Sequence, residues 1–302
     1  MRTTFIDHSF AVPELMGFSS LAETARVYVT RASDALEPVL IAAEHGFDPL
    51  AVCRVVHDNS EARHGAFRPL DCVNQTAETF LAAVSERFAS QSLVLVNLDQ
   101  LSPPLQEHLA RMLQDDPVLG PRAGTRVMAT VCGNVEDAIG GGVLLRDLSR
   151  RFPLQIDVPP LRRRPSDVPI LIACVAAEAA GACEVPVPGF SREALTVLSA
   201  LPWRKNLHEL REVLDVLVLV AEGGTLQLED ILAHVPIDRL WARPPVSASL
   251  RDARNHFERE YIASVLSRHR GRMDDAARAL GVQRTNLYRK VRQLGIGRAR
   301  SR

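Results

Sequence analysis

The chain has 302 residues, of which 46% are hydrophobic, 24% charged and 5% aromatic. This balance excludes wholesale disorder and fits one large domain or two small ones. The first residues lack an apolar stretch, and the longest near-apolar run, 168–177, is too short to cross a bilayer, so we expect neither a signal peptide nor membrane contact. The five cysteines are scattered, which argues against a metal site and predicts buried free thiols in a reducing cytoplasm.

The formal net charge of zero hides an asymmetry along the chain. Residues 249–302 contain 14 basic and 5 acidic residues, a net charge of +9. The preceding 248 residues contain 22 basic and 31 acidic residues, a net charge of −9. A basic C-terminal segment on an acidic body is typical of nucleic-acid-binding proteins.

Five short β-rich runs alternate with helical patterns in the first 160 residues. The expected strands are 38–42, 67–70, 92–96, 125–131 and 154–158. The expected helices between them are 21–31, 49–57, 77–88 and 103–114. This alternation predicts an α/β fold in which helices cover both faces of a parallel sheet.

Only helical patterns follow Pro159 and Pro160. Helices are expected at 167–180, 192–200 and 206–221, then at 250–269, 273–280 and 283–294. A Pro- and Ser-rich stretch separates the two sets. We therefore expect four parts: an α/β part over 1–160, a helical subdomain over 161–235, a linker over 236–248 and an all-α domain over 249–302.

The last two predicted helices have the pattern of a helix-turn-helix. Ala276 and Ala277 permit close helix packing, Gly281 suits a turn with positive φ, and Leu287 and Val291 form the buried face of the second helix. The opposite face presents the candidate DNA-binding residues Gln283, Arg284, Thr285, Asn286, Arg289 and Lys290. Such side chains read base edges and hold phosphates. The alternative is an ordinary helical hairpin with a solvated basic face.

Residues 250–296, including LGVQRTNLYRKVRQLGI, resemble a Fis-type DNA-binding domain. The resemblance implies a dimer that reads two half-sites of double-stranded DNA. It assigns base contacts to Gln283, Arg284 and Asn286, and phosphate contacts to Arg289 and Lys290. An apolar stripe also favours a dimer; it comprises Phe257, Tyr261, Ile262 and Val265. Asp274 departs from the family, which usually has a hydroxyl residue there.

The body, roughly residues 14–235, is similar to the sigma-54-interaction AAA+ domain of bacterial enhancer-binding proteins. The most specific matches are VPPLRRRPSDVP at 158–169 and LPWRKNLHEL at 201–210. The resemblance implies an AAA+ sheet with a helical lid. Because about a dozen residues precede the match, we expect no N-terminal sensory domain.

The phosphate-binding loop of that family is degraded in this chain. Such a loop needs glycines whose N–H groups hold phosphates, followed by a lysine. Only Gly46 remains of the glycines, Asp48 replaces another, and Pro49 stands in place of the lysine. Asp48 and Pro49 make a sound helix start but a poor anion site, because they add a negative charge and remove a donor.

The other nucleotide-binding positions are also altered. The two acids expected after the Walker B strand are Val96 and Asn97. The paired arginine fingers correspond to Leu145 and Arg151, and the sensor-II arginine to His208. The inserted loop that contacts sigma-54 is deleted, because residues 77–88 run almost directly into the strand at 92–96. We therefore expect no catalytic residue, cofactor or metal, and a degenerate nucleotide site at Gly46, Asp48, Pro49, Val96, Asn97, Arg151 and His208.

Three further features receive structural interpretations. His57 is expected to be a satisfied structural histidine, and Trp203 to be a core residue of the helical subdomain. Arg162, Arg163 and Arg164 are expected to form a solvated or domain-bridging cluster.

The combined expectation is a cytoplasmic bacterial transcription regulator. It binds double-stranded DNA as a homodimer or higher homo-oligomer, and its AAA+ body serves as a platform that contacts RNA polymerase with a sigma factor other than sigma-54. The first alternative is a nucleotide-binding switch or weak ATPase of the sigma-54 activator type, against which Pro49, Val96 and Asn97 argue. The second is a DNA-bending architectural protein, which would not need so large a body.

Overall fold

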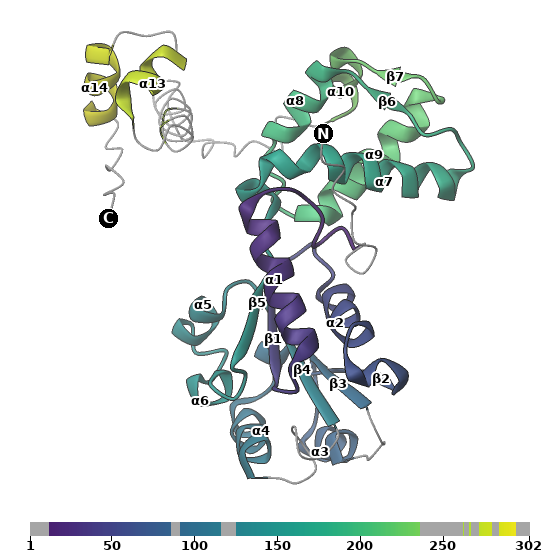
Figure 1. Cartoon of the computed structure of the whole chain (residues 1–302), viewed down its shortest axis with the longest axis vertical. Coiled ribbons are helices and arrows are strands. Elements are labelled where there is room, and N and C mark those ends of the chain that lie inside the picture. The colour runs from purple at the N-terminus through teal and green to yellow at the C-terminus, as the bar shows by residue number, and fades with distance from the viewer. Residues whose placement is uncertain are drawn as a thin grey trace. The chain divides into compact units, whose positions relative to one another are not determined.

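The computed structural model describes residues 12–85, 91–115 and 125–235, and in the C-terminal region residues 262, 266, 272–279 and 284–293. Internal contacts divide the chain into two units, Met1–Leu240 and Trp241–Arg302. Each unit is described by itself. Figure 1 shows the elements of both.

The first unit is built on a five-stranded parallel sheet. Its strand order is β2-β3-β4-β1-β5, and all its pairings are parallel. The strands are β1 (Val39–Ala43), β2 (Phe67–Asp71), β3 (Gln91–Val96), β4 (Thr125–Cys132) and β5 (Leu154–Asp157). The expected parallel α/β fold is confirmed, and each strand lies within one residue of the predicted bounds.

Helices cover both faces of this sheet (Figure 1). Val39 and Ile41 of β1 face one side, where they pack with α1 (Ser20–Asp34) and α2 (Pro49–Asp58). Leu40 and Ala42 face the other side. That side is covered by α3 (Ala77–Ser85), α4 (Pro103–Asp115), α5 (Val135–Gly140) and α6 (Arg146–Ser149). Strand β1 is therefore buried on both faces, which is consistent with its continuous apolar run.

Short 3-10 helices connect several of these elements. They are η2 (Glu61–His64), η3 (Leu98–Gln100), η4 (Leu161–Arg163) and η5 (Pro165–Asp167). His57 of α2 is buried, and its Nδ1 lies 2.8 Å from Ser92 Oγ on β3. Burial lowers the pKa of this histidine. His57 thus acts as a satisfied structural histidine, as expected.

The helical subdomain contains α7 (Val168–Cys183), α8 (Arg192–Ala200), α9 (Asn206–Ala221) and α10 (Leu228–His234). A two-stranded parallel sheet, β6 (Gly189–Phe190) with β7 (Thr225–Leu226), joins them. The short elements β6, β7 and α10 were not predicted from the sequence. Trp203 is fully buried, and its Nε1–H donates to the Leu198 carbonyl at 2.9 Å, which confirms its place in the core.

Within the described residues one helical segment, Pro165–Cys183, is long and apolar enough to cross a membrane by length and composition. The sequence expectation of no such segment did not anticipate this. Val168, Leu171 and Ile172 of α7 are buried in the core shared with α8 and α9. The composition of this segment is therefore explained by its position as the core helix of the subdomain.

None of the five cysteines forms a disulfide. Cys53 and Cys72 are buried, and burial raises the pKa of both thiols, that of Cys72 to about 12. Cys132 and Cys174 are only partly buried, and Cys183 is exposed because it ends α7 at the surface. The expectation of buried thiols is thus wrong for three of them.

In the second unit the structure describes α13 (Met273–Ala279) and α14 (Arg284–Gln293). Ala276, Ala277 and Leu287 are buried together with Ile262, and Val291 packs against this cluster. Ile262 thus contributes to the core of its own unit. Phe257, Tyr261 and Val265, the other members of the predicted dimer stripe, lie outside the described residues, as do Gly281 and the expected linker at 236–248.

Candidate functional sites in the two units

The loop between β1 and α2 leads into a well-capped helix. Asp48 has an extended backbone, and its Oδ1 accepts a hydrogen bond from the Leu50 N–H at 2.9 Å. Pro49 occupies the first helical position, where its missing N–H costs nothing. The helix start therefore forms as the sequence predicts, and its first donors are already used or absent.

A buried carboxyl group accepts a hydrogen bond from another backbone amide of this loop. The Asp48 N–H donates to Glu14 Oε1 at 3.1 Å. Glu14 is only 2% exposed, and burial raises the pKa of its carboxyl group. The protein's own carboxyl groups thus take the Asp48 and Leu50 amides that an anion at a helix N-terminus would need. Sequence reasoning missed Glu14, because it lies 34 residues from its partner.

The helical subdomain closes directly on the same loop. The Gly46 carbonyl accepts a hydrogen bond from the His208 N–H at 2.9 Å. Gly46 has φ of +89°, and a Cβ at this position would lie 1.7 Å from the Lys205 carbonyl oxygen. Only glycine satisfies both the positive φ and this close approach. The one surviving glycine of the loop is therefore required by packing against α9.

Side chains reinforce this closure. Arg162 donates to both oxygens of Glu44 at 2.6 Å, and this bidentate pair lowers the pKa of the Glu44 carboxyl group. The Asn206 amide donates to the His45 carbonyl at 2.9 Å and accepts from the Leu161 N–H at 3.0 Å. Asn206 is fully buried. The start of the helical subdomain is thus anchored to the loop by an ion pair and a buried amide.

The neighbouring arginines behave differently from one another. Arg162 forms the expected bridge between the two parts of the unit. Arg164 is fully buried and therefore not solvated, but it too bridges the two parts of the unit, as the other alternative expects. Its Nη1 donates to the Met16 carbonyl at 3.0 Å, and burial lowers the pKa of its guanidinium group to about 10.

The carboxyl ends of β1, β4 and β5 border a cavity of about 720 Å³. Ligands of parallel α/β sheets bind at this edge. Three carboxylates line the cavity, from Glu44, Asp137 and Asp157, against two arginines. One of these, Arg162, is paired with Glu44. The lining therefore lacks the excess positive charge that a triphosphate needs.

The end of β3 carries no acid at the two positions that would hold and activate a metal-bound nucleotide. Val96 ends the strand, and Asn97 follows with φ of 56°. The Asn97 N–H donates to Thr130 Oγ1 at 3.0 Å. Asp99 lies one turn later, and its Oδ1 accepts from the Cys132 N–H at 3.2 Å. This carboxylate joins η3 to the end of β4, a role that sequence reasoning missed.

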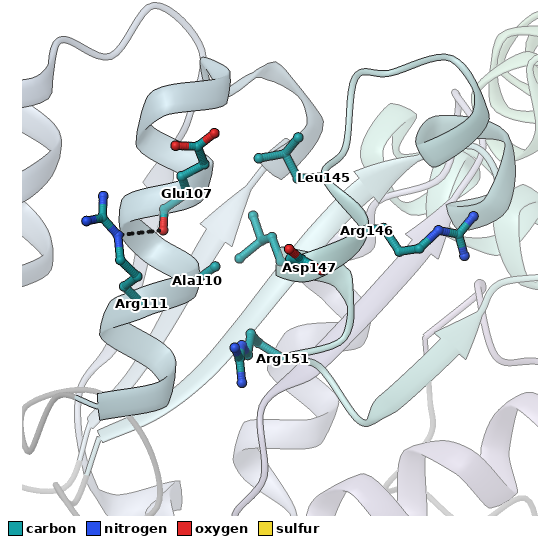
Figure 2. A pocket seen from close by; sticks show the side chains of 8 residues that line it. Glu107, Ala110, Arg111, Leu145, Arg146, Asp147 and Arg151 are labelled. Atoms are coloured by element: carbon teal, nitrogen blue, oxygen red, sulfur yellow. Dashed lines mark hydrogen bonds between the residues drawn. The ribbon is translucent and has the colours of Figure 1, made fainter.

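The remaining nucleotide-site candidates point to other partners. His208 pairs its Nε2 with Glu212 at 3.4 Å on the exposed side of α9. Arg151 and Leu145 line a cavity of about 450 Å³ between α4 and α6, as Figure 2 shows. Arg151 donates to Gln114. The backbone N–H of His208 therefore contacts Gly46, while its side chain pairs with Glu212. The Arg151 guanidinium group contacts α4.

The described part of the helix-turn-helix is amphipathic. Leu287 is buried and Val291 is partly buried, whereas Arg284, Asn286 and Arg289 are exposed. Lys290 is partly buried. Thr285 belongs to α14, and Gln283 lies outside the described residues. The described residues therefore present the polar face expected of a recognition helix.

Arg284 is held by two neighbours. Its Nη1 lies 3.0 Å from Asp274 Oδ1 on α13, and its guanidinium carbon lies 5.6 Å from the centre of the Tyr288 ring. The sequence marked Asp274 as an unusual acid but gave no partner for it.

Two segments of the chain match known families. Residues 162–239 match the AAA+ ATPase lid domain, and residues 253–298 match the bacterial regulatory protein Fis family. Nearly the whole chain also aligns with curated transcription regulators. It is 25% identical to the nitrogen assimilation regulatory protein NtrX of Azorhizobium caulinodans, over 94% of this chain and 69% of that protein. It is 27% identical to the formate hydrogenlyase transcriptional activator of Salmonella typhimurium strain LT2, over 96% of this chain and 45% of that protein.

The solved structure of NtrX from Brucella abortus has the same fold. It superposes with a TM-score of 0.69 at 23% identity, over 93% of this chain and 69% of that one. The same NtrX has been solved in complex with ADP and with ATP. The chain spans 66–69% of the length of the NtrX and NtrX-like relatives and less than half of the formate hydrogenlyase activator. Taken together, the AAA+ lid, the Fis-type helix-turn-helix and the parallel sheet show that this chain is homologous to the NtrX- and NtrC-type sigma-54 activators.

Proposed function

We propose that the chain is a sequence-specific DNA-binding transcription regulator that acts in the cytoplasm as a homodimer or higher homo-oligomer. The exposed residues Arg284, Asn286 and Arg289 on α14 support DNA binding, as does the net charge of +9 over residues 249–302. The Fis-family match over residues 253–298 supports the same function.

We further propose that the AAA+ body neither binds nor hydrolyses ATP. The observation that carries this proposal is the state of the loop before α2. Pro49 has no N–H, the Leu50 amide is capped by Asp48, and the Asp48 amide is taken by Glu14. Charge-assisted contacts contribute about 1.5–3 kcal/mol each. Losing three of them weakens binding by about three orders of magnitude or more.

The body then serves as a fixed platform. The Arg162–Glu44 pair and Asn206 hold the helical subdomain on the loop between β1 and α2 through direct protein contacts. With a platform of this kind, the affinity for DNA does not change when ATP is added.

The proposed partner is RNA polymerase with a sigma factor other than sigma-54. Only five residues, 86–90, separate the end of α3 from the start of β3. This is the length of an ordinary connection and leaves no room for an inserted contact loop.

A gel-shift series with the full chain tests DNA binding. The probe is a duplex selected by the wild-type chain from a randomised pool. Arg284→Ala is expected to cost about 1–3 kcal/mol and to relax base preference. Lys290→Ala is expected to weaken binding to all sequences alike. It is also expected to lower by about 1 the magnitude of the slope of log affinity against log salt concentration.

Arg31→Ala provides a control that removes one exposed arginine from α1, in the other unit. It is expected to leave binding unchanged. If neither helix variant differed from this control, the DNA-binding assignment of α14 would be wrong.

A further inference from the structure

The first turn of α13 carries two adjacent acids with different partners. Asp275 lies 3.8 Å from Arg278 on its own helix. Asp274 instead reaches the second helix, where its Oδ1 lies 3.0 Å from Arg284 Nη1. Only the second pair links α13 to the arginine at the start of α14.

The contact is well suited to orienting a guanidinium group. Arginine presents its donors in a planar fork that reads the O6 and N7 acceptors of guanine through two parallel hydrogen bonds. A carboxylate on Nη1 and an aromatic ring beside the plane restrict the rotation of that fork. Asp274 and Tyr288 supply these two restraints on Arg284.

The pair also affects phosphate contacts. An arginine that is free to rotate reaches any nearby phosphate and adds affinity without sequence information. The Asp274 carboxylate competes with phosphate for the same guanidinium and repels the DNA backbone. The side chains of Asp274 and Arg284 are 62% and 57% exposed, so DNA can approach both.

We propose that Asp274 is a positioning residue for DNA sequence specificity, which holds Arg284 ready for a guanine edge and withholds it from phosphates. This inference rests on the proposed function of α14 as the recognition helix. It assigns to the acid a role in discrimination rather than a simple loss of affinity.

The test compares specific and non-specific binding of the full chain. The specific probe is a duplex selected by the wild-type chain from a randomised pool, and the non-specific probe is a scrambled duplex of equal length and composition. Asp274→Asn removes the charge and keeps the size. It is expected to tighten binding to the scrambled duplex and to raise by about 1 the magnitude of the slope of log affinity against log salt concentration. The specificity ratio, which is the affinity for the selected duplex divided by that for the scrambled duplex, is expected to fall roughly five- to tenfold.

Two further variants separate positioning from bulk charge. Asp275→Asn removes the same charge from the neighbouring residue but leaves the Asp274–Arg284 pair intact, so the specificity ratio is expected to stay at the wild-type value. Asp274→Glu keeps a carboxylate within reach of Arg284 and is expected to recover most of the ratio. Circular dichroism checks that each variant remains folded.

Two results would overturn the proposal. One is an equal gain in affinity of Asp274→Asn for both duplexes, matched by Asp275→Asn, because that is general charge repulsion. The other is a loss of ratio that Asp274→Glu fails to restore at all. A wild-type chain that selects no sequence from the pool would instead refute the proposed function itself.

Discussion

Asn206→Ala probes the anchor between the helical subdomain and the loop after β1. Asn206 is fully buried, and it satisfies the Leu161 N–H and the His45 carbonyl. Leaving the buried Leu161 donor unpaired costs about 1–3 kcal/mol, and the lost bond to His45 adds about 0.5–1.5 kcal/mol. We therefore expect the free energy of unfolding of the first unit to fall by about 2–4 kcal/mol.

Chemical denaturation of the full chain measures this change. The chain has two tryptophans, so a Trp241→Phe background leaves the buried Trp203 as the only tryptophan reporter. Asn74→Ala is the matched control, because Asn74 has φ of 56°, close to the 47° of Asn206, but is exposed. The control measures the cost of alanine in the left-handed region. If Asn206→Ala lost no more than Asn74→Ala, the anchoring role of the amide would be refuted.

Three further outcomes follow from the same loop. Gly46→Ala is expected to destabilise the first unit strongly, because its Cβ would overlap the backbone of the helical subdomain; an unchanged melting temperature would contradict the fit described here. Because Arg162 lowers the pKa of Glu44, the stability that this pair adds should be full above about pH 4.5 and lost as the pH falls through the lowered value. The stability difference between wild type and Glu44→Gln, followed by denaturation at several pH values, should therefore shrink in acid, and a difference independent of pH would argue against the pair. Pro49→Lys alone is expected to leave ATP binding undetectable by calorimetry, because Glu14 still occupies a loop amide; recovery of binding would show that the lysine is the only missing part.

Local sequence signals predicted much of the fold. The alternation of strands and helices indicated a sheet covered on both faces, and both faces of β1 are indeed packed. Asp48 followed by Pro49 indicated a helix start, and the cap forms as predicted. Leu287 and Val291, at helical spacing, indicated the buried face of α14. These features succeed because each depends on residues only a few positions apart.

Contacts across long sequence separations could not be predicted. Glu14 meets the Asp48 amide across 34 residues, and Asn206 meets His45 across 161. Both contacts depend on how the elements pack, which no short pattern records. The motif comparison could show that the phosphate loop had lost its lysine, but not that the Glu14 carboxyl group had taken the Asp48 amide. Likewise, Asp274 was noticed as an acid, but its pair with Arg284 depends on the angle between two helices.

Calorimetric titration of the full chain with ATP and magnesium tests the central claim most directly. NtrX from Brucella abortus, which has been solved with ATP bound, serves as the positive control under the same conditions. We predict no saturable heat for this chain at millimolar ATP and an unchanged affinity for its selected duplex when ATP is present. Saturable binding tighter than about 1 mM would contradict the account and would favour a nucleotide-binding switch instead.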